Sequence, residues 1–67
     1  MVTWELKEVL AEIGGNKRLT LTSWNNAAPK LDLRKWQEDG KPGRGMTLTD
    51  EEAQALLEAL TAYLEGG

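Results

Sequence analysis

Two central segments of the chain alternate between apolar and polar side chains. In Lys17–Trp24 and again in Lys30–Trp36, leucines stand two positions apart. Because successive side chains of a β-strand point to opposite faces, this period predicts two strands with one apolar face each. The apolar side, here called the leucine face, comprises Leu19, Leu21, Leu31 and Leu33. The opposite side, here called the tryptophan face, comprises Arg18, Thr20, Thr22, Trp24, Lys30, Asp32, Arg34 and Trp36.

The first segment, residues 2–13, also alternates, but its apolar positions change parity part-way. Val2, Trp4 and Leu6 are even, whereas Val9, Ala11 and Ile13 are odd. A strand with one extra residue, a β-bulge, near Lys7 and Glu8 explains the change. A helix is the alternative, because several of the same apolar positions also fit a period of 3.6 residues. We favour the strand, followed by a turn at residues 14–16.

The C-terminal third predicts a loop, a short strand and a helix. Residues 38–45 are rich in Gly and contain a Pro, which indicates a loop, and residues 46–48 then predict a last, brief strand. Thr49 and Glu52 match a capping box, so a helix should begin there. Its apolar stripe comprises Ala53, Leu56, Leu57, Leu60 and Leu64. We expect this stripe to cover the leucine face of a four-stranded α+β domain.

The length of 67 residues allows one domain, spanning residues 1–67, with a single small core. Cores of this size rarely supply more than about 3–5 kcal/mol without a further stabilising device. The sequence has no Cys, so a disulfide cannot provide it. We therefore expect a homodimer, formed by the helix and the adjoining strand. The helix contacts should involve Leu56, Ala59, Leu60 and Tyr63, because Ala59 and Tyr63 widen the apolar surface beyond what one small sheet needs.

The net charge of −3 conceals a strong asymmetry along the chain. Residues 1–16 carry −2 and residues 45–67 carry −5, whereas residues 17–44 carry +4. All the Lys and Arg residues except Lys7 lie in that central segment. A local positive surface is therefore expected on an acidic protein.

Catalysis is not indicated by any group of residues. The sequence has no His or Cys, which excludes imidazole acid–base chemistry and thiolate metal sites. The acidic run at residues 50–52 is explained by the helix dipole at a helix N-terminus. We expect a non-enzymatic protein that uses no cofactor or metal. Because no apolar run reaches the ~18–20 residues of a membrane span or resembles a signal peptide, we also expect a cytoplasmic location without membrane contact.

The tryptophan face carries the clearest functional signal. Each of its two strands combines cations and small polar side chains with one Trp, on a side that a half-buried sheet leaves in solvent. Single-stranded nucleic acid is bound by this combination, since cations contact phosphates and each indole stacks on a base for about 1–3 kcal/mol. The alternative is that the tryptophans pack across turns or between subunits and the cations are merely solvated. The residues alone leave both interpretations open.

Two further segments connect this face to a known family. Residues 29–36 (PKLDLRKW) and 41–49 (KPGRGMTLT), followed by an acidic helix start, resemble the single-stranded-DNA-binding domain of the transcriptional positive cofactor four family, in its small bacterial and phage members. The resemblance covers roughly residues 17–64 and includes Ser23-Trp24-Asn25. It implies a curved four-stranded antiparallel sheet with one C-terminal helix, dimerised through helices and adjoining strands.

The resemblance also implies roles for single residues. Arg34 corresponds to a basic strand residue, Trp36 to an aromatic stacking residue, and Lys41 and Arg44 to loop cations. The loop is one residue shorter than usual at Gly45, and the acidic total charge predicts weaker, more salt-sensitive binding.

We therefore expect a non-catalytic single-stranded-DNA-binding protein of low sequence specificity, cytoplasmic and either nucleoid-associated or phage-encoded. It would act as a transcription cofactor or in replication or repair. The alternatives are an RNA-binding module on the same face and a protein-interaction dimer. The expected contact residues are Lys17, Arg18, Thr20, Thr22, Trp24, Lys30, Arg34, Trp36, Lys41 and Arg44.

Overall fold

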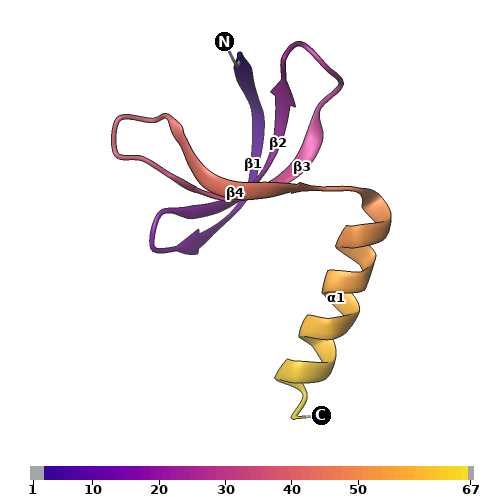
Figure 1. The fold of residues 1–67 in the computed structure, drawn as a ribbon. Helices are drawn as coiled ribbons and strands as arrows, with labels where there is room; N and C mark the ends of the chain where they lie inside the picture. The colour runs from indigo at the N-terminus through magenta and orange to yellow at the C-terminus, as the bar shows by residue number, and fades with distance from the viewer. Residues whose placement is uncertain (1–2, 67) are drawn as a thin grey trace.

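A computed structural model describes residues 3–66, which form one antiparallel sheet and one helix (Figure 1). The elements are β1 (Trp4–Gly14), β2 (Lys17–Trp24), β3 (Lys30–Trp36), β4 (Pro42–Leu48) and α1 (Asp50–Leu64). Each strand pairs with the next in the order β1-β2-β3-β4. The α+β fold class expected from the sequence is confirmed, and β2 and β3 have the predicted bounds. The predicted start of the first strand at Val2 lies outside the described residues.

Strand β1 is extended, so the helical alternative for this segment is wrong. Its pairing with β2 slips between Leu6 and Glu8, where the change of parity predicted a bulge. Two further slips lie between Val9 and Ala11 and between Glu12 and Gly14. Bulges increase the local twist and bend a strand, so three of them in eleven residues curve this side of the sheet strongly.

The turn between β1 and β2 has two residues, Gly15 and Asn16, with φ values of 59° and 64°. Positive φ at both positions is the requirement of a type I′ turn, whose twist matches that of the two strands it joins. Gly and Asn adopt this conformation most readily, which explains the turn. It is one residue shorter than the predicted turn at residues 14–16, because Gly14 belongs to β1.

Strand β4 is longer than the brief strand predicted for residues 46–48, because it begins at Pro42. A loop was expected up to residue 45, on account of the glycines. These glycines instead allow the backbone of β4 to lie close against β3. A Cβ on Gly43 would lie 2.7 Å from the carbonyl oxygen of Lys35, and a Cβ on Gly45 would collide with the Cα and Cβ of Arg34.

The sheet curls so that the tryptophan face is on the inside. Trp4 on β1 and Trp36 on β3 meet across the intervening strand β2, with ring centroids 5.4 Å apart in an edge-to-face arrangement. Thr20 and Thr22, on β2 between them, are completely buried. Part of this face is therefore buried, so the expectation that all of it lies in solvent while the leucine face forms the core is wrong. Lys30 stays exposed, and Arg18, Trp24 and Arg34 stay partly exposed. The leucines of β2 and β3 are only partly buried.

The helix begins with the predicted capping box, in which the Thr49 hydroxyl accepts from the Glu52 amide and the Glu52 carboxylate accepts from the Thr49 amide. Thr49 alone separates β4 from α1, so the helix leaves directly from the end of the sheet (Figure 1). At 1.5 Å per residue it is about 22 Å long, and most of it extends beyond the sheet. No helix in the described part of the chain has the length and apolar character needed to cross a membrane.

The expectation that α1 covers the leucine face holds only for the first turns of the helix, and no residue of the helix is buried. The first turns approach this face and leave an apolar groove of about 200 Å³. The groove is lined by Leu19, Leu31, Leu48, Ala53, Leu56, Leu57 and Leu60. Further along the helix, Tyr63 and Leu64 are each 77% exposed. A single chain therefore leaves a continuous apolar surface unpaired.

Candidate nucleic-acid interface

A buried carboxylate organises the tryptophan face. Asp32 is 0% exposed, and its two oxygens receive different donors. Trp24 Nε1 donates to Oδ2 at 2.9 Å, and Arg34 Nε donates to Oδ1 at 2.5 Å. A buried charge is costly unless it is paired and hydrogen-bonded, and Asp32 meets both conditions. Asp32 on β3 thus holds Trp24 of β2 and Arg34 of its own strand.

The Arg34 guanidinium lies over the indole ring of Trp24, 4.5 Å from the ring centroid. Its Nη1 also donates to the Gly43 carbonyl of β4 at 3.1 Å. These contacts leave the Arg34 side chain 15% exposed. Cation–π contacts of this kind contribute about 0.5–2 kcal/mol, more where water is excluded. The result is a rigid stack of a guanidinium on an indole, in which Trp24 remains partly exposed.

Three of the expected contact residues are buried in this conformation. The hydroxyls of Thr20 and Thr22 lie 2.8 Å apart and are hydrogen-bonded to each other. Trp36 is 3% exposed because Trp4 packs on it, and its Nε1 is buried without a hydrogen-bond partner among the described residues. The expectation that these three side chains face solvent is thus corrected. The curvature of the sheet, which alternation along one strand does not reveal, is the physical reason.

The expected cations divide between the two faces of the sheet. Arg18 and Lys30 lie on the tryptophan face, as cross-strand partners of Arg34 and Thr22, and Lys41 is exposed in the loop that leads into β4. Lys17 instead pairs with Lys35, which alternates with Arg34 and so belongs to the opposite face. Arg44 lies opposite Lys35 on β4. The structure therefore does not bring all the expected cations together.

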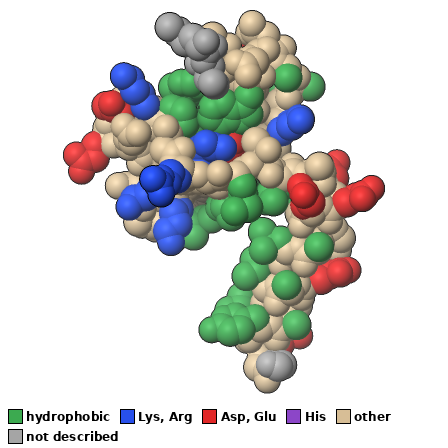
Figure 2. All heavy atoms as spheres, in the orientation of Figure 1, with side chains coloured by type: hydrophobic (Ala, Val, Ile, Leu, Met, Phe, Trp, Pro, Cys, Tyr) green, Lys and Arg blue, Asp and Glu red, His purple; other side chains and the backbone are tan. Residues whose placement is uncertain are grey.

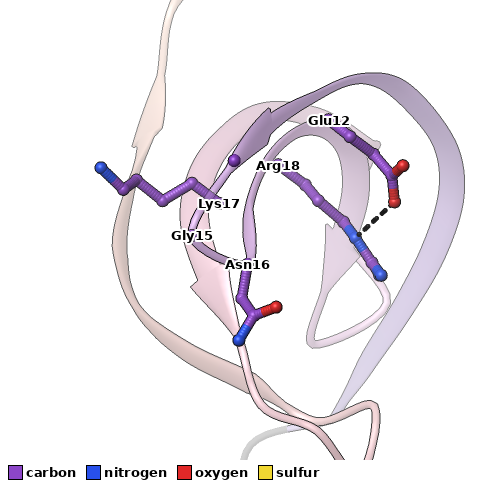
Figure 3. Close-up of a pocket in the computed structure, with 6 residues that line it drawn as sticks. Glu12, Gly15, Asn16, Lys17 and Arg18 are labelled. Atoms are coloured by element: carbon purple, nitrogen blue, oxygen red, sulfur yellow. Dashed lines mark ion pairs between the residues drawn. The ribbon is translucent and has the colours of Figure 1, made fainter.

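A polar hollow of about 270 Å³ lies at the β1–β2 turn (Figure 3). Arg18 and Glu12 extend toward one another there, with Arg18 Nε 3.4 Å from Glu12 Oε1. The side chain of Lys17 points the other way (Figure 3). Exposed ion pairs contribute only about 0–1 kcal/mol, so Arg18 can exchange Glu12 for another anion at little cost.

Charge is separated along the molecule (Figure 2). The Lys and Arg side chains gather over the sheet, whereas many of the Asp and Glu side chains lie along the helix, on the side away from its hydrophobic stripe. This arrangement follows the sequence, in which residues 17–44 carry a net charge of +4 and all the charged residues of 45–67 are acids. The acidic total therefore does not weaken the positive potential at the sheet as much as a mixed surface would.

Sequence reasoning missed two members of this site. Asp32 was placed on the tryptophan face without a role, although an acid between two cations on an otherwise basic face is the signal for a buried ion pair. Trp4 lies on the first strand, outside the two strands that define the tryptophan face in the sequence; it packs on Trp36, yet it remains 39% exposed and adds an accessible ring to the face.

Comparison with known families decides what kind of domain carries this site. The family model described as Transcriptional Coactivator p15 (PC4) matches residues 11–59, which is more than half of the chain. The chain belongs to the PC4 family. The PC4 match extends from the end of β1 into α1 and includes all of β2, β3 and β4. The resemblance to this family is confirmed, and the family is one of single-stranded-DNA-binding domains; a bacterial or phage origin stays a prediction. No curated protein matches the chain significantly.

Proposed function

We propose that this PC4-family protein is a non-catalytic single-stranded-DNA-binding protein of low sequence specificity, acting as a transcription cofactor or in replication or repair. The observation that supports this most directly is the stack of Arg34 on the partly exposed Trp24 ring, held from below by Asp32. An indole fixed in this way offers a base a flat surface without losing side-chain freedom on binding.

The cations around the stack would contact the phosphates. Arg18, Lys30 and Lys41 are the partly or fully exposed ones on or beside the tryptophan face. Phosphate contacts position a strand without reading its sequence. Thr20, Thr22 and Asp32, whose side chains could otherwise read base edges, are buried and bonded to other groups of the face. Low sequence specificity follows, because stacking accepts any base.

The roles of the tryptophans in this proposal differ from those implied by the resemblance. Trp24 and Trp4 present accessible ring surface, whereas Trp36 is the buried support on which Trp4 rests. Trp36 would contact a base only if Trp4 moved aside. The two threonines are hydrogen-bonded to each other and form the buried part of the face between the rings.

We propose that the protein acts as a homodimer. The exposed stripe of α1 and the groove beside the leucine face form one apolar surface, and monomeric proteins rarely expose large contiguous surfaces of this kind. A second copy would bury Leu56, Ala59, Leu60 and Tyr63, with the leucine face as the adjoining strand surface. The tryptophan face, on the other side of the sheet, would stay free. A cytoplasmic, nucleoid-associated or phage-encoded protein fits this role.

A binding assay with three labelled oligomers of matched sequence tests the function. Fluorescence anisotropy with single-stranded DNA, single-stranded RNA and duplex DNA should give the tightest binding for single-stranded DNA. Tighter binding of RNA would favour the RNA-binding alternative, because RNA differs at the 2′-hydroxyl. Binding of none of the three at low salt would contradict the proposal and leave the face to a protein partner.

A further inference from the structure

A row of three cations crosses the sheet near the β1–β2 turn. Lys17 on β2 is the direct cross-strand partner of Lys35 on β3. The slip in register between Arg34 and Trp36 leaves Gly43 and Arg44 of β4 opposite Lys35. Lys17, Lys35 and Arg44 are all exposed. With neighbouring strands about 4.8 Å apart, this cation row places three positive charges within roughly 10 Å.

The cation row is not part of the tryptophan face. Lys35 stands between Arg34 and Trp36 on one strand, so its side chain points to the opposite side of the sheet. Figure 3 shows the same for β2, where Lys17 and Arg18 extend in opposite directions. The row therefore lies on the leucine face, beyond Leu19 and Leu33 at the end of the sheet.

This placement of charge is unfavourable in the free protein. Like charges directly opposite each other on neighbouring strands destabilise a sheet. In the part of the chain that the structure describes, the ion pairs involve Lys7, Arg18 and Arg34, and none reaches the cation row. Glu12 and Asp32 form ion pairs with Arg18 and Arg34, which lie on the other face. An anionic ligand would remove the repulsion that the fold leaves uncompensated.

The position of the row indicates which anion fits. Lys17 and Lys35 directly adjoin Arg18 and Arg34 in sequence, so the row is separated from the proposed strand-binding face only by the thickness of the sheet. A polyanion that leaves the tryptophan face around the β1–β2 turn meets it next. A flexible phosphate backbone can follow this path and contact both the tryptophan face and the cation row. A small anion could contact the cation row only.

We propose that the cation row is a second phosphate-binding site, which holds the backbone of a bound single strand after it passes around the end of the sheet. This inference rests on the proposed function, because the polyanion is nucleic acid. It adds Lys35 to the interface and gives Lys17 and Arg44 a separate role from Arg18 and Lys41. It also predicts that the row contributes only when the strand is long enough to reach it.

The test compares oligothymidines of about 8 and about 30 nucleotides, of which the first lies within and the second exceeds the roughly 4–16 nucleotides bound by one OB fold. The variant is Lys17→Gln with Lys35→Gln, and the control is Lys7→Gln, which removes a cation already paired with Glu5. For the long strand, the variant should reduce the slope of log K against log salt by about 1.4, or 0.7 for each lost contact. The short strand should bind the variant and the wild type equally.

Thermal unfolding of the same variant provides the second readout. Removing the repulsion between Lys17 and Lys35 should leave its unfolding midpoint equal to or above that of the wild type, so weaker binding cannot be attributed to misfolding. If the slope for the long strand is unchanged, or if the variant loses the same affinity for both strands, the cation row is not a separate binding site. Absence of wild-type binding to either strand would instead contradict the proposed function itself.

Discussion

Single residues determine the shape of the candidate site more than its overall composition does. The carboxylate of Asp32 holds Trp24 through one oxygen and Arg34 through the other, and Arg34 in turn covers the Trp24 ring. These contacts fix the positions of three side chains from two strands relative to one another. Breaking a buried ion pair by removing one partner costs about 3–5 kcal/mol, so this cluster stabilises both the fold and the geometry of the site.

Two conservative substitutions separate the tryptophans by their hydrogen bonds. Trp24→Phe keeps a ring beneath Arg34 but removes the donor to buried Asp32, and hydrogen bonds to charged groups contribute about 1.5–3 kcal/mol. We expect the free energy of unfolding in urea to fall by that amount. Trp36→Phe removes an Nε1 that has no partner among the described residues, so the loss should be smaller although Trp36 is more deeply buried. An equal or larger loss for Trp36→Phe would contradict this account of the cluster.

Gly45 is predicted to be essential for the approach of β4 to β3. Ala at this position would place a Cβ against the backbone and side chain of Arg34, and overpacking of this kind costs about 1–3 kcal/mol. Gly15→Asn is the matched control, because its φ of 59° suits Asn and its Cβ would meet only an ordinary contact. Thermal unfolding should show a clearly lower midpoint for Gly45→Ala alone. A Gly45→Ala protein as stable as the wild type would disprove the close approach.

At the scale of elements, the sequence predicts the strands and the helix well because their signals are local. Alternation identifies β2 and β3 to the residue, and the parity change in β1 locates its first bulge. The capping box at Thr49 marks the start of α1 through side chains three residues apart. None of these features depends on contacts with distant parts of the chain.

The buried face could not be predicted in the same way. Leucines on one side suggested the core, yet the bulges of β1 curl the sheet toward the other side and bring Trp4 onto Trp36. That contact joins residues far apart in the sequence, so no local pattern predicts it. For the candidate site, alternation found Trp24, Arg18 and Arg34, whereas the pairing of Lys17 with Lys35 required the observed register.

The capping box should contribute measurably to helix stability. Thr49→Ala removes the acceptor for the Glu52 amide, and loss of an N-cap side chain costs about 1 kcal/mol. Thr61→Ala changes the same residue type at an exposed position inside α1, where Ala has the higher helix propensity. Circular dichroism during thermal unfolding should show a lower midpoint for Thr49→Ala and an equal or higher one for Thr61→Ala. The same sign for both would show that the cap is unimportant.

At the scale of the whole molecule, the tryptophan face and the apolar part of the leucine face have separate tasks, and the cation row lies beyond the leucines at the end of the sheet. The tryptophan face encloses a small core and exposes cations with partly accessible rings, whereas the leucine face and α1 leave apolar surface unpaired. A protein of 67 residues with so little buried by its own helix would gain stability from the proposed association. Dimerisation through one face and strand binding on the other are therefore compatible.

A pair of charge insertions tests the dimer. Leu60→Glu places a carboxylate in the apolar stripe of α1, whereas Gln54→Glu adds the same charge at an exposed polar position of that helix. Sedimentation equilibrium should give a dimer for the wild type and for Gln54→Glu, and a monomer or unfolded chain for Leu60→Glu. A monomeric wild type at micromolar concentration would rule out the homodimer.

The most direct test of the central claim is the quenching of tryptophan fluorescence by a single-stranded oligothymidine, measured in the wild type over a series of salt concentrations. If bases stack on Trp24 and phosphates contact Arg18, Lys30 and Lys41, fluorescence should be quenched on binding. The slope of log K against log salt should then have a magnitude of at least about 2, because each phosphate contact on a single strand contributes roughly 0.7. Absence of quenching at low salt, or binding that does not change with salt, would contradict a nucleic-acid-binding tryptophan face.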